Sequence, residues 1–521
     1  MTTEAIEGDP TQVTQTSQSE YSSLPDFNVP AWNSLLGNGT VTAPHLLFKL
    51  DHPIRRSSVV SSDASESFKQ PCHDFYRRAM WAPDGSVMLA ITESQQKHVL
   101  DFSRTGVIQR KLQTKSPSPL LDAIWYPVPA IEQSKDDADS IASDHLATCT
   151  ATWCFAESHR DLPVRLTSST DSSLRATYSI MNHVEKFVGP HSLAFSPDLC
   201  RIYCGLYSCL AVFPLSTPGL NTHSHIPLIS AKRSSNGQRG IISAIATVAH
   251  PSEPSTHELV AVGTFQGTIG IYDLVPAQFP QPVEHTAMSS YDEQALAQSS
   301  CLAGWREVEG EGITQLKFHP RSPYVLFVAS RRSNYIYVYD TRYLMGDTSR
   351  WSFKPLIEPS KGVRSAHLLA KLRRPGGNSH QRMYFDVDWA GRWIATGDEH
   401  GVISLWRIDS ERFTDVGTED EESTVAVELL PDLNWRAHQD AIGSVCFHAH
   451  EPWLVSVSGS RHWRDPGSDY DSDSYQDCES SACESPQGGG DQKGAWFSED
   501  SSLKVWNFSK PPSDMAVSCK A

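Results

Sequence analysis

The chain has 521 residues, a formal net charge of −17, 39% hydrophobic residues and 11 cysteines. This composition allows a sizeable core, while 31 glycines and 33 prolines favour many turns over long helices. No apolar run approaches the ~18 residues that span a bilayer, and residues 1–30 lack the pattern of a signal peptide, so we expect an intracellular protein without a membrane partner. The cysteines lack the paired spacing of a zinc site, so we expect neither a metal nor a cofactor.

The acidic residues are unevenly distributed along the chain. They gather within residues 1–26, 132–145, 415–432 and 464–500, segments that together carry a charge of −24. The rest of the chain is therefore mildly basic, at about +7. The overall charge argues against a nucleic-acid partner, but this distribution keeps such a partner open.

The first plausible strand is His45–Leu50, after a segment rich in Ser, Thr, Gln and Asn. Residues 1–43 have too few apolar side chains for a core, so we interpret them as a disordered N-terminal tail. Residues 511–521 form a C-terminal tail by the same reasoning. The segment 44–510 remains as the folded part.

One pattern recurs through the folded part. In Arg382–Trp406 (RMYFDVDWAGRWIATGDEHGVISLW), apolar and polar residues alternate between glycine-containing turns, which predicts three short antiparallel strands. Similar units begin near Phe75, Leu121, His191, Gly240, Gly312 and Asp440. Several of them end in a form close to the WD signature (IYDL, VYDT, LWRI, VWNF), and their usual period is about 40 residues.

About seven such units predict an all-β fold, a seven-bladed WD-repeat β-propeller over residues 44–510 with disordered acidic loops. A single meander cannot bury its own faces, so each blade must pack against the next around a closed ring. We expect His45–Leu50 to complete the blade that ends at Phe508, which would close the ring. The insertions between repeated strands are expected at 132–145, 276–310, 346–381, 410–435 and 464–498.

Several segments resemble one family of WD-repeat proteins. Leu174–Asp198 (LRATYSIMNHVEKFVGPHSLAFSPD), GQRGIISAIA, YVYDTRYL and QRMYFDVDWAGRWIATGDEHGVISLW are similar to the telomerase Cajal body protein 1 family over roughly Phe75 to Ser460. The resemblance implies a scaffold that binds small Cajal-body RNAs and telomerase RNA, directs them to Cajal bodies, and folds with the help of a chaperonin. The Ser- and Asp-rich insertions look like those of a fungal member, whose branch is linked to pre-mRNA splicing.

No motif for catalysis appears in the sequence, so we expect no enzyme. The sequence lacks a P-loop, a GxSxG elbow, an HExxH motif and a dinucleotide-binding glycine fingerprint. The pairs Asp386/Asp388 and His448/His450 each share one face of a strand, and we interpret them as solvent-facing or turn-bonding residues. Asp273, Asp340 and Asp500 are interpreted as acceptors for nearby backbone amides.

The most basic segment, Arg350–Arg382, carries a net charge of +7. Its cations and nearby aromatic residues suit phosphates and unpaired bases. We therefore predict RNA contacts from Arg331, Arg332, Lys361, Arg364, Lys371, Arg373, Arg374 and Arg382. The alternatives are a solvated basic loop and a nuclear-import signal, KLRRP at Lys371.

Taken together, the repeat, the resemblance and the basic segment lead to one functional hypothesis. We expect a non-catalytic WD-repeat scaffold in the nucleus, with the cytoplasm as a second location, that binds small nuclear or telomerase-type RNA and ribonucleoprotein or spliceosomal proteins. The alternative is a splicing-associated or general protein-interaction propeller that does not touch RNA.

Overall fold

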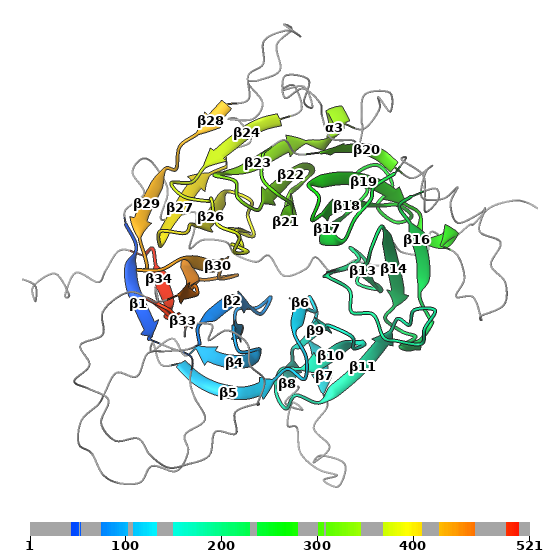
Figure 1. Cartoon of the computed structure of the whole chain (residues 1–521), viewed down its shortest axis with the longest axis horizontal. Coiled ribbons are helices and arrows are strands. Elements are labelled where there is room, and N and C mark those ends of the chain that lie inside the picture. The colour runs from blue at the N-terminus through cyan, green and yellow to red at the C-terminus, as the bar shows by residue number, and fades with distance from the viewer. Residues whose placement is uncertain are drawn as a thin grey trace, which may run out of the picture.

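The computed structural model describes residues 43–51, 53, 74–102, 108–132, 150–229, 237–279, 301–306, 309–344, 368–408, 427–463 and 496–509. These residues form seven sheets of four or five strands, arranged as a ring (Figure 1), and we call the central region enclosed by the innermost strands the channel. The expected seven-bladed β-propeller is thereby confirmed. Among the described residues, no helix is long and apolar enough to cross a membrane.

Each blade is an antiparallel meander whose strands follow one another from the channel outward. Blade one holds β2 (Tyr76–Trp81), β3 (Val87–Thr92), β4 (Gln96–Phe102) and β5 (Ile108–Lys115); blade two holds β6 (Leu120–Trp125), β9 (Cys154–His159), β10 (Val164–Ser168) and β11 (Leu174–Ser179). Blade three holds β12 (Ser192–Phe195), β13 (Arg201–Gly205), β14 (Cys209–Pro214) and β16 (Ser224–Pro227); blade four holds β17 (Ile242–Ala249), β18 (Glu258–Thr264), β19 (Thr268–Leu274) and β20 (Cys301–Arg306).

The remaining three blades follow the same plan. Blade five holds β21 (Ile313–His319), β22 (Ser322–Ser330), β23 (Tyr335–Asp340) and β24 (Leu368–Arg373); blade six holds β25 (Asp386–Val387), β26 (Trp393–Gly397), β27 (Val402–Arg407) and β29 (Leu433–Arg436); blade seven holds β30 (Ile442–Phe447), β31 (Trp453–Ser458), β34 (Leu503–Asn507) and β1 (His45–Leu50). Two short strands add in parallel to outer edges: β15 (Gly219–Leu220) to β11, and β28 (Val427–Leu429) to β24. Two helical turns, η2 (Pro276–Gln278) and α3 (Thr341–Leu344), lie in connections.

Blade seven closes the ring with strands from both ends of the folded part. β1 pairs antiparallel with β34, with His45 opposite Asn507 and Leu50 opposite Leu503. Leu47, Phe48 and Leu50 pack against the hydrophobic cluster between blades seven and one. The expected role of His45–Leu50 as the closing strand is confirmed.

Four strands at the outer edges of blades lie wholly or mostly inside segments that the sequence assigns to insertions. β20 falls within 276–310, β24 within 346–381, and β28 and β29 within 410–435. These strands follow long connections, and β24, β28 and β29 carry polar side chains on one face, so neither spacing nor a continuous apolar run marks them. Most of the other expected insertions and both tails lie outside the described residues.

Seven hydrophobic clusters hold the described part of the ring together, one between each pair of adjacent blades. In the cluster between blades six and seven, Trp393 and Ile403 pack against Ile442 and Trp506. Both faces of each blade are therefore buried, which explains why most residues of the second strands, polar ones included, are buried.

Polar side chains on or next to the innermost strands bridge all seven blade junctions. The side-chain to backbone bridges are Asp122 to the amide of Leu193, Ser192 to the carbonyl of Ile242, Ser243 to that of Ile313, Gln315 to both backbone groups of Phe385, Asp386 to the amide of Phe447 and Ser444 to the amide of Ala79. Arg78 donates to the carboxylate of Asp122 across the remaining junction at 2.9 Å. These residues satisfy backbone groups that the innermost strands leave unpaired toward the channel.

The stretch Arg382–Trp406 forms three strands, as its alternation predicts. Trp393 and Trp406 are almost completely buried. Asp388 accepts hydrogen bonds from the backbone amides of Arg392 and Trp393 at 2.6 and 2.7 Å, so it is the turn-bonding residue that the sequence suggests. Asp386 instead bridges two blades and pairs with Lys317 at 2.5 Å.

Candidate functional site

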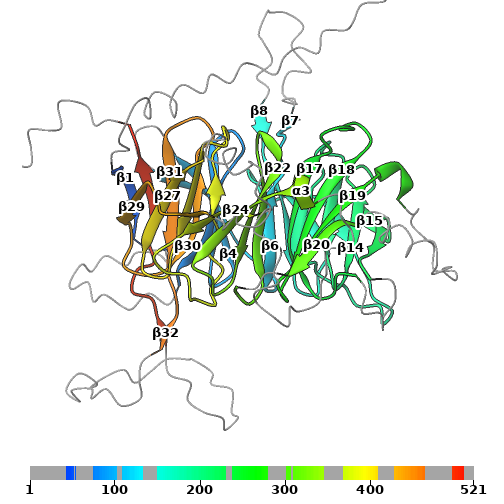
Figure 2. The same cartoon turned by 90° about the horizontal axis from the view of Figure 1, so that it is seen from above.

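The ring has two opposite faces. The innermost strands begin at one face, which also carries the turns between second and third strands and the ribbon formed by β32 (His462–Trp463) and β33 (Trp496–Phe497). They end at the other face, which carries the ribbon formed by β7 (Ala130–Glu132) and β8 (Thr150–Thr152). Figure 2 shows β32 and the β7–β8 pair projecting in opposite directions.

The basic segment predicted to contact RNA is described from residue 368 onward. Lys361 and Arg364 therefore lie outside the described residues. Lys371 and Arg373 lie on β24, the outer strand of blade five, far from the channel. Lys371 pairs with Glu309 at 3.5 Å, and Arg373 pairs with Glu428 of the added strand β28 at 3.0 Å. Acidic neighbours thus offset much of the charge that the sequence shows here.

Arg374 is a structural residue, and its burial argues against the predicted RNA contact. It is only 2% exposed, and its guanidinium donates twice to the carbonyl of Ser333, from Nε at 3.1 Å and from Nη2 at 2.6 Å. Burial lowers its pKa to about 10, opposed by the nearby carboxylates of Asp398 and Glu399. The burial arises because Arg374 occupies the connection that leads from the outer strand of blade five to the channel.

Arg331, Arg332 and Arg382 lie at the face where the innermost strands begin. Arg331 and Arg332 occupy the turn between β22 and β23, and Arg382 precedes β25. Arg332 points to an acidic partner, Glu311, at 2.5 Å, and to the amide oxygen of Asn378 at 3.2 Å. Arg382 reaches the carbonyl of Ser243, so it connects blade six to blade four.

Aromatic rings accompany these cations. The guanidinium of Arg331 lies 5.4 Å from the ring centroid of Phe265, which His191 contacts edge-on at 6.2 Å. The ring of Tyr384 lies between two guanidiniums, that of Arg78 at 4.2 Å and that of Arg382 at 5.4 Å. We call Arg78, Arg160, His191, Arg331 and Arg382, with the rings of Phe265 and Tyr384, the basic mouth.

The electrostatics of the basic mouth reflect its crowded positive charge. Burial and then the charge of Arg382 lower the pKa of Arg331. Burial, followed by Arg382 and Arg160, lowers the pKa of His191. Arg331 and Arg382 therefore repel each other, an effect that Glu311 partly offsets, and His191 lies near both Arg382 and Arg160. An anion at this mouth would relieve that repulsion.

The sequence-based prediction did not include the residues of the basic mouth that lie outside the basic segment and the Arg331–Arg332 turn. Arg78, Arg160, His191, Phe265 and Tyr384 are spread over some 300 residues and form no basic run. These residues do share a position within the repeat. Each precedes an innermost strand, lies near its beginning, or lies in a turn between second and third strands. Aligning the repeats by these positions would have found them.

The opposite end of the channel opens into a cavity of about 580 Å³. All seven blades contribute to its wall, mainly with apolar residues where the innermost strands end. We call it the apolar mouth; its aromatic residues are Trp81, Trp125, Phe195, Phe318, Trp389 and Phe447, and four turn prolines, Pro83, Pro127, Pro197 and Pro320, also line it. Trp389 is 59% exposed, whereas the other five aromatic side chains are largely buried.

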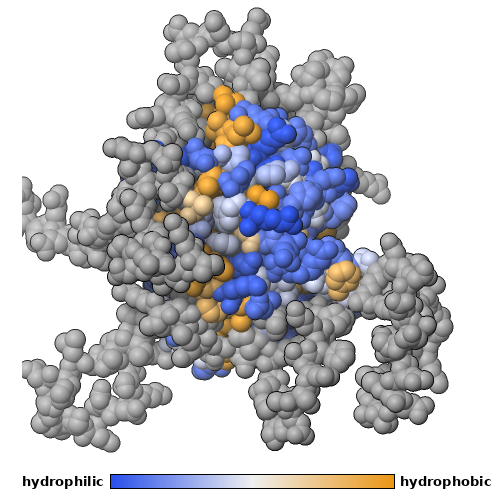
Figure 3. Space-filling model, turned by 90° about the vertical axis from the view of Figure 1, so that its left-hand side faces the viewer, coloured by the Kyte–Doolittle hydropathy of each residue, from blue (hydrophilic) through white to orange (hydrophobic). Residues whose placement is uncertain are grey.

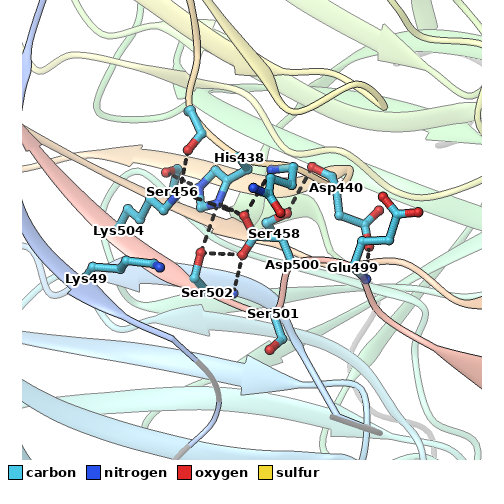
Figure 4. A network of polar contacts seen from close by, with 12 residues as sticks. Lys49, His438, Asp440, Ser456, Ser458, Glu499, Asp500, Ser501, Ser502 and Lys504 are labelled. Atoms are coloured by element: carbon cyan, nitrogen blue, oxygen red, sulfur yellow. Dashed lines mark hydrogen bonds and ion pairs between the residues drawn. The ribbon is translucent and has the colours of Figure 1, made fainter. Parts of the chain in front are cut away.

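A Ser–His–Asp arrangement in blade seven is structural rather than catalytic. In Figure 4, His438 lies between Asp500 and Ser456, with Nδ1 3.2 Å from the carboxylate and Nε2 2.7 Å from the hydroxyl. Trp506 Nε1–H donates to the same hydroxyl at 2.9 Å. Burial lowers the pKa of His438, and the side chains of His438 and Ser456 are inaccessible to solvent, so no substrate can reach them.

Asp500 is the outer member of this chain of hydrogen bonds. It also accepts from the amides of Gln439 and Ser502, at 3.0 and 2.9 Å, as the sequence suggests. The arrangement ties the connection before β30 to the turn before β34, and it stabilises the last blade of the ring.

The fold and this hydrogen-bond chain define the class: the chain is a seven-bladed WD-repeat β-propeller. The family model described as "WD domain, G-beta repeat" matches residues 431–464, which include His438 and Ser456. This match covers a single repeat.

Among curated proteins, the chain is similar to telomerase Cajal body protein 1 from several animals. It is 26% identical to the Mesocricetus auratus protein over 78% of this chain and 62% of that protein, and 24% identical to the Homo sapiens protein over 78% of this chain and 61% of that protein. The chain thus spans less than two thirds of these relatives. It is also 24% identical to the Schizosaccharomyces pombe "Guanine nucleotide-binding protein negative regulator 1" over 64% of this chain and 71% of that protein. The resemblance seen in the sequence is confirmed.

Proposed function

We propose that the protein is a non-catalytic scaffold of a small nuclear ribonucleoprotein and that it contacts RNA through the basic mouth. Its relatives named telomerase Cajal body protein 1 support a telomerase-type or small Cajal-body ribonucleoprotein as the assembly, and the nucleus as its location. The same resemblance supports assistance by a chaperonin during folding.

The observation that carries this proposal is the convergence of cations and aromatic rings from separate blades. Guanidiniums bind phosphate oxygens as hydrogen-bond donors, while aromatic faces and guanidinium planes stack on unpaired bases. Arg331 beside Phe265, and Arg382 beside Tyr384, combine both kinds of group at one channel mouth. Lys371 and Arg373, which lie farther out and are paired with glutamates, are proposed to contribute less.

Crosslinking and sequencing of RNA bound to the full-length protein in cells tests this function. We expect recovery of small nuclear or telomerase-type RNA, and the double variant Arg331→Glu/Arg382→Glu should reduce it by about tenfold or more because two phosphate contacts become repulsive. Arg321→Glu/Arg392→Glu is the matched control, since both arginines are exposed on the opposite face. Equal loss in the two double variants, or no such RNA above background, would contradict the proposal.

A protein-interaction adaptor without RNA contact is the second candidate, and two observations favour it. The fungal relative has a name that refers to a guanine nucleotide-binding protein rather than to RNA. The basic strand β24 is largely paired with glutamates, so its charge is less available to phosphates than the sequence implies. This adaptor, including a splicing-associated one, is supported if crosslinking recovers only background RNA while partner proteins still copurify.

A further inference from the structure

The apolar mouth lies opposite the proposed RNA contact and differs from it in chemistry. We propose that it binds a short, uncharged peptide segment of another protein, rich in proline and aromatic residues. This inference does not depend on the proposed RNA contact, because the two mouths share no residue.

The wall of the apolar mouth determines the chemistry of its occupant. Its charged pair, Lys317 and Asp386, is already matched internally at 2.5 Å, and Asp386 also accepts the amide of Phe447 at 2.8 Å. A charged group entering the cavity would lose hydration without finding an unpaired counter-charge there. An uncharged occupant is therefore favoured.

The aromatic and proline residues favour proline and aromatic side chains in the occupant. Trp389 presents an exposed indole ring at the rim, and Pro127 lines the wall next to Val128, which is 45% exposed. Proline-rich segments dock on aromatic surfaces because they are preformed and lose little conformational entropy on binding. Large exposed apolar side chains at the edge of a concave site are typical of protein-interaction surfaces.

Shape selects an extended segment over a folded partner surface. The cavity volume of about 580 Å³ has the size of a small-ligand site, but its apolar surface continues onto exposed residues at the rim. A second copy meeting face to face would place one concave surface against the same concave surface, which cannot fill either cavity. The side wall of the ring seen in Figure 3 is mostly hydrophilic, with hydrophobic residues in smaller patches.

Selection of peptides from a random twelve-residue library displayed on phage, against the full-length protein, tests this inference. We expect enriched peptides that contain proline and aromatic residues and few charges. A labelled synthetic copy of the strongest peptide should bind Trp389→Ala about tenfold or more weakly than the unaltered protein, because an exposed tryptophan at such a site is a typical hot spot. Val128→Asp, which places a charge at the rim, should also weaken binding.

Trp463→Ala is the matched control. Trp463 is 55% exposed, close to the 59% of Trp389, but it lies on the ribbon at the opposite face. The proposal is overturned if no peptide is enriched above a control protein, if the selected peptides are charged, if Trp389→Ala binds as well as the unaltered protein, or if Trp463→Ala weakens binding equally.

Competition experiments decide among other occupants. Displacement of the labelled peptide by a synthetic peptide covering residues 1–42 would assign the mouth to this chain itself and overturn the proposal. Concentration-dependent dimerisation that the peptide abolishes would show that the apolar mouth binds a second copy of the chain. Binding of the dye 8-anilinonaphthalene-1-sulfonate without any peptide binding would show that it is a small-molecule site. Either result would also overturn the proposal. RNA capture by Trp389→Ala should remain unchanged, so failure here is distinguishable from failure of the proposed function.

Discussion

The two mouths of the channel lie at opposite ends of the same seven innermost strands and yet present opposite chemistry. At the face where the innermost strands begin lie Arg331 and Arg382 with the rings of Phe265 and Tyr384. At their ends lie aromatic and proline residues around a charge pair that is already matched. The comparison teaches that the contacts that hold the ring together leave the surface residues at its two faces free to differ in chemistry.

Bridging residues on the innermost strands contribute to the ring independently of the surface chemistry at the two mouths. Ser192 and Ser243 bond backbone carbonyls of the next blade, and Gln315 bonds both backbone groups of Phe385. These bridges and the hydrophobic clusters behind them supply the stability of the ring. Residues that take no part in these bridges or clusters can therefore change without opening the ring.

The largest expected effect is on stability at the basic mouth. Asp122→Ala should lower the free energy of unfolding by roughly 2–4 kcal/mol, because the amide of Leu193 and the guanidinium of Arg78 both lose a partner in a mostly buried site. Chemical denaturation of the full-length protein measures this change.

Asp84→Ala is the control for that substitution at the other face. Asp84 accepts from the amide and hydroxyl of Ser86 within its own exposed turn, so its loss should cost about 1 kcal/mol or less. Similar costs for the two aspartates would show that bridging between blades does not distinguish the two ends of the strands.

A second expected effect concerns salt. Arg331→Gln should reduce the slope of log affinity for RNA against log salt concentration by about one, the value for one lost phosphate contact. Arg321→Gln, on the face of the apolar mouth, should leave the slope unchanged. Fluorescence anisotropy over a salt series measures both, and peptide binding at the apolar mouth should vary little over the same series.

The smallest expected effect is a pH dependence of RNA binding. Burial, Arg382 and Arg160 lower the pKa of His191, so its imidazole is neutral at pH 7 and gains a proton only below its ordinary range near 6.5. RNA affinity should thus be flat from pH 8 to 7 and rise only as the pH falls below about 6.5, by about two- to fivefold once a positive charge is added. His191→Gln should remove this rise, and a rise that persists in the variant would exclude His191 as its source.

Stability responds to acid with the opposite sign. Burial lowers the pKa of His159 to about 4, opposed by Glu157, and lowers that of His223 to about 4. The unfolded chain therefore binds more protons between about pH 6.5 and 4, and the folded state loses stability as the pH falls through that window. RNA affinity must accordingly be measured only where the protein remains folded.

The sequence predicted the architecture well because local patterns report it. Alternation over Arg382–Trp406 and the recurring turns indicated the number of blades, and the isolated strand His45–Leu50 indicated the closure. The outer strands β20, β24 and β29 were hidden because they follow long connections and lack the continuous apolar runs of inner strands. Whether these segments form strands depends on pairing with the free edge of the third strand, and this edge exists only once the blade has folded.

The candidate site was predictable only in part, because charge along a sequence is not charge on a surface. Arg350–Arg382 looked like one basic patch, but the described part of it separates into a buried structural residue, Arg374, two glutamate-paired cations on β24, and Arg382 at the channel. Arg78 and His191 join Arg382 only after the ring closes. No local run marks residues that come together from different blades.

The pairing of β1 with β34 has a consequence for the connectivity of the chain. His45 stands opposite Asn507, so the two ends of the folded part lie within about 5 Å of each other across one antiparallel pair. Joining them through a short linker would make the propeller a continuous loop, which could be opened in another exposed turn such as the one at Asp84. The order of the blades along the chain could thus be permuted. New chain termini could be placed near either mouth without altering the residues that form it.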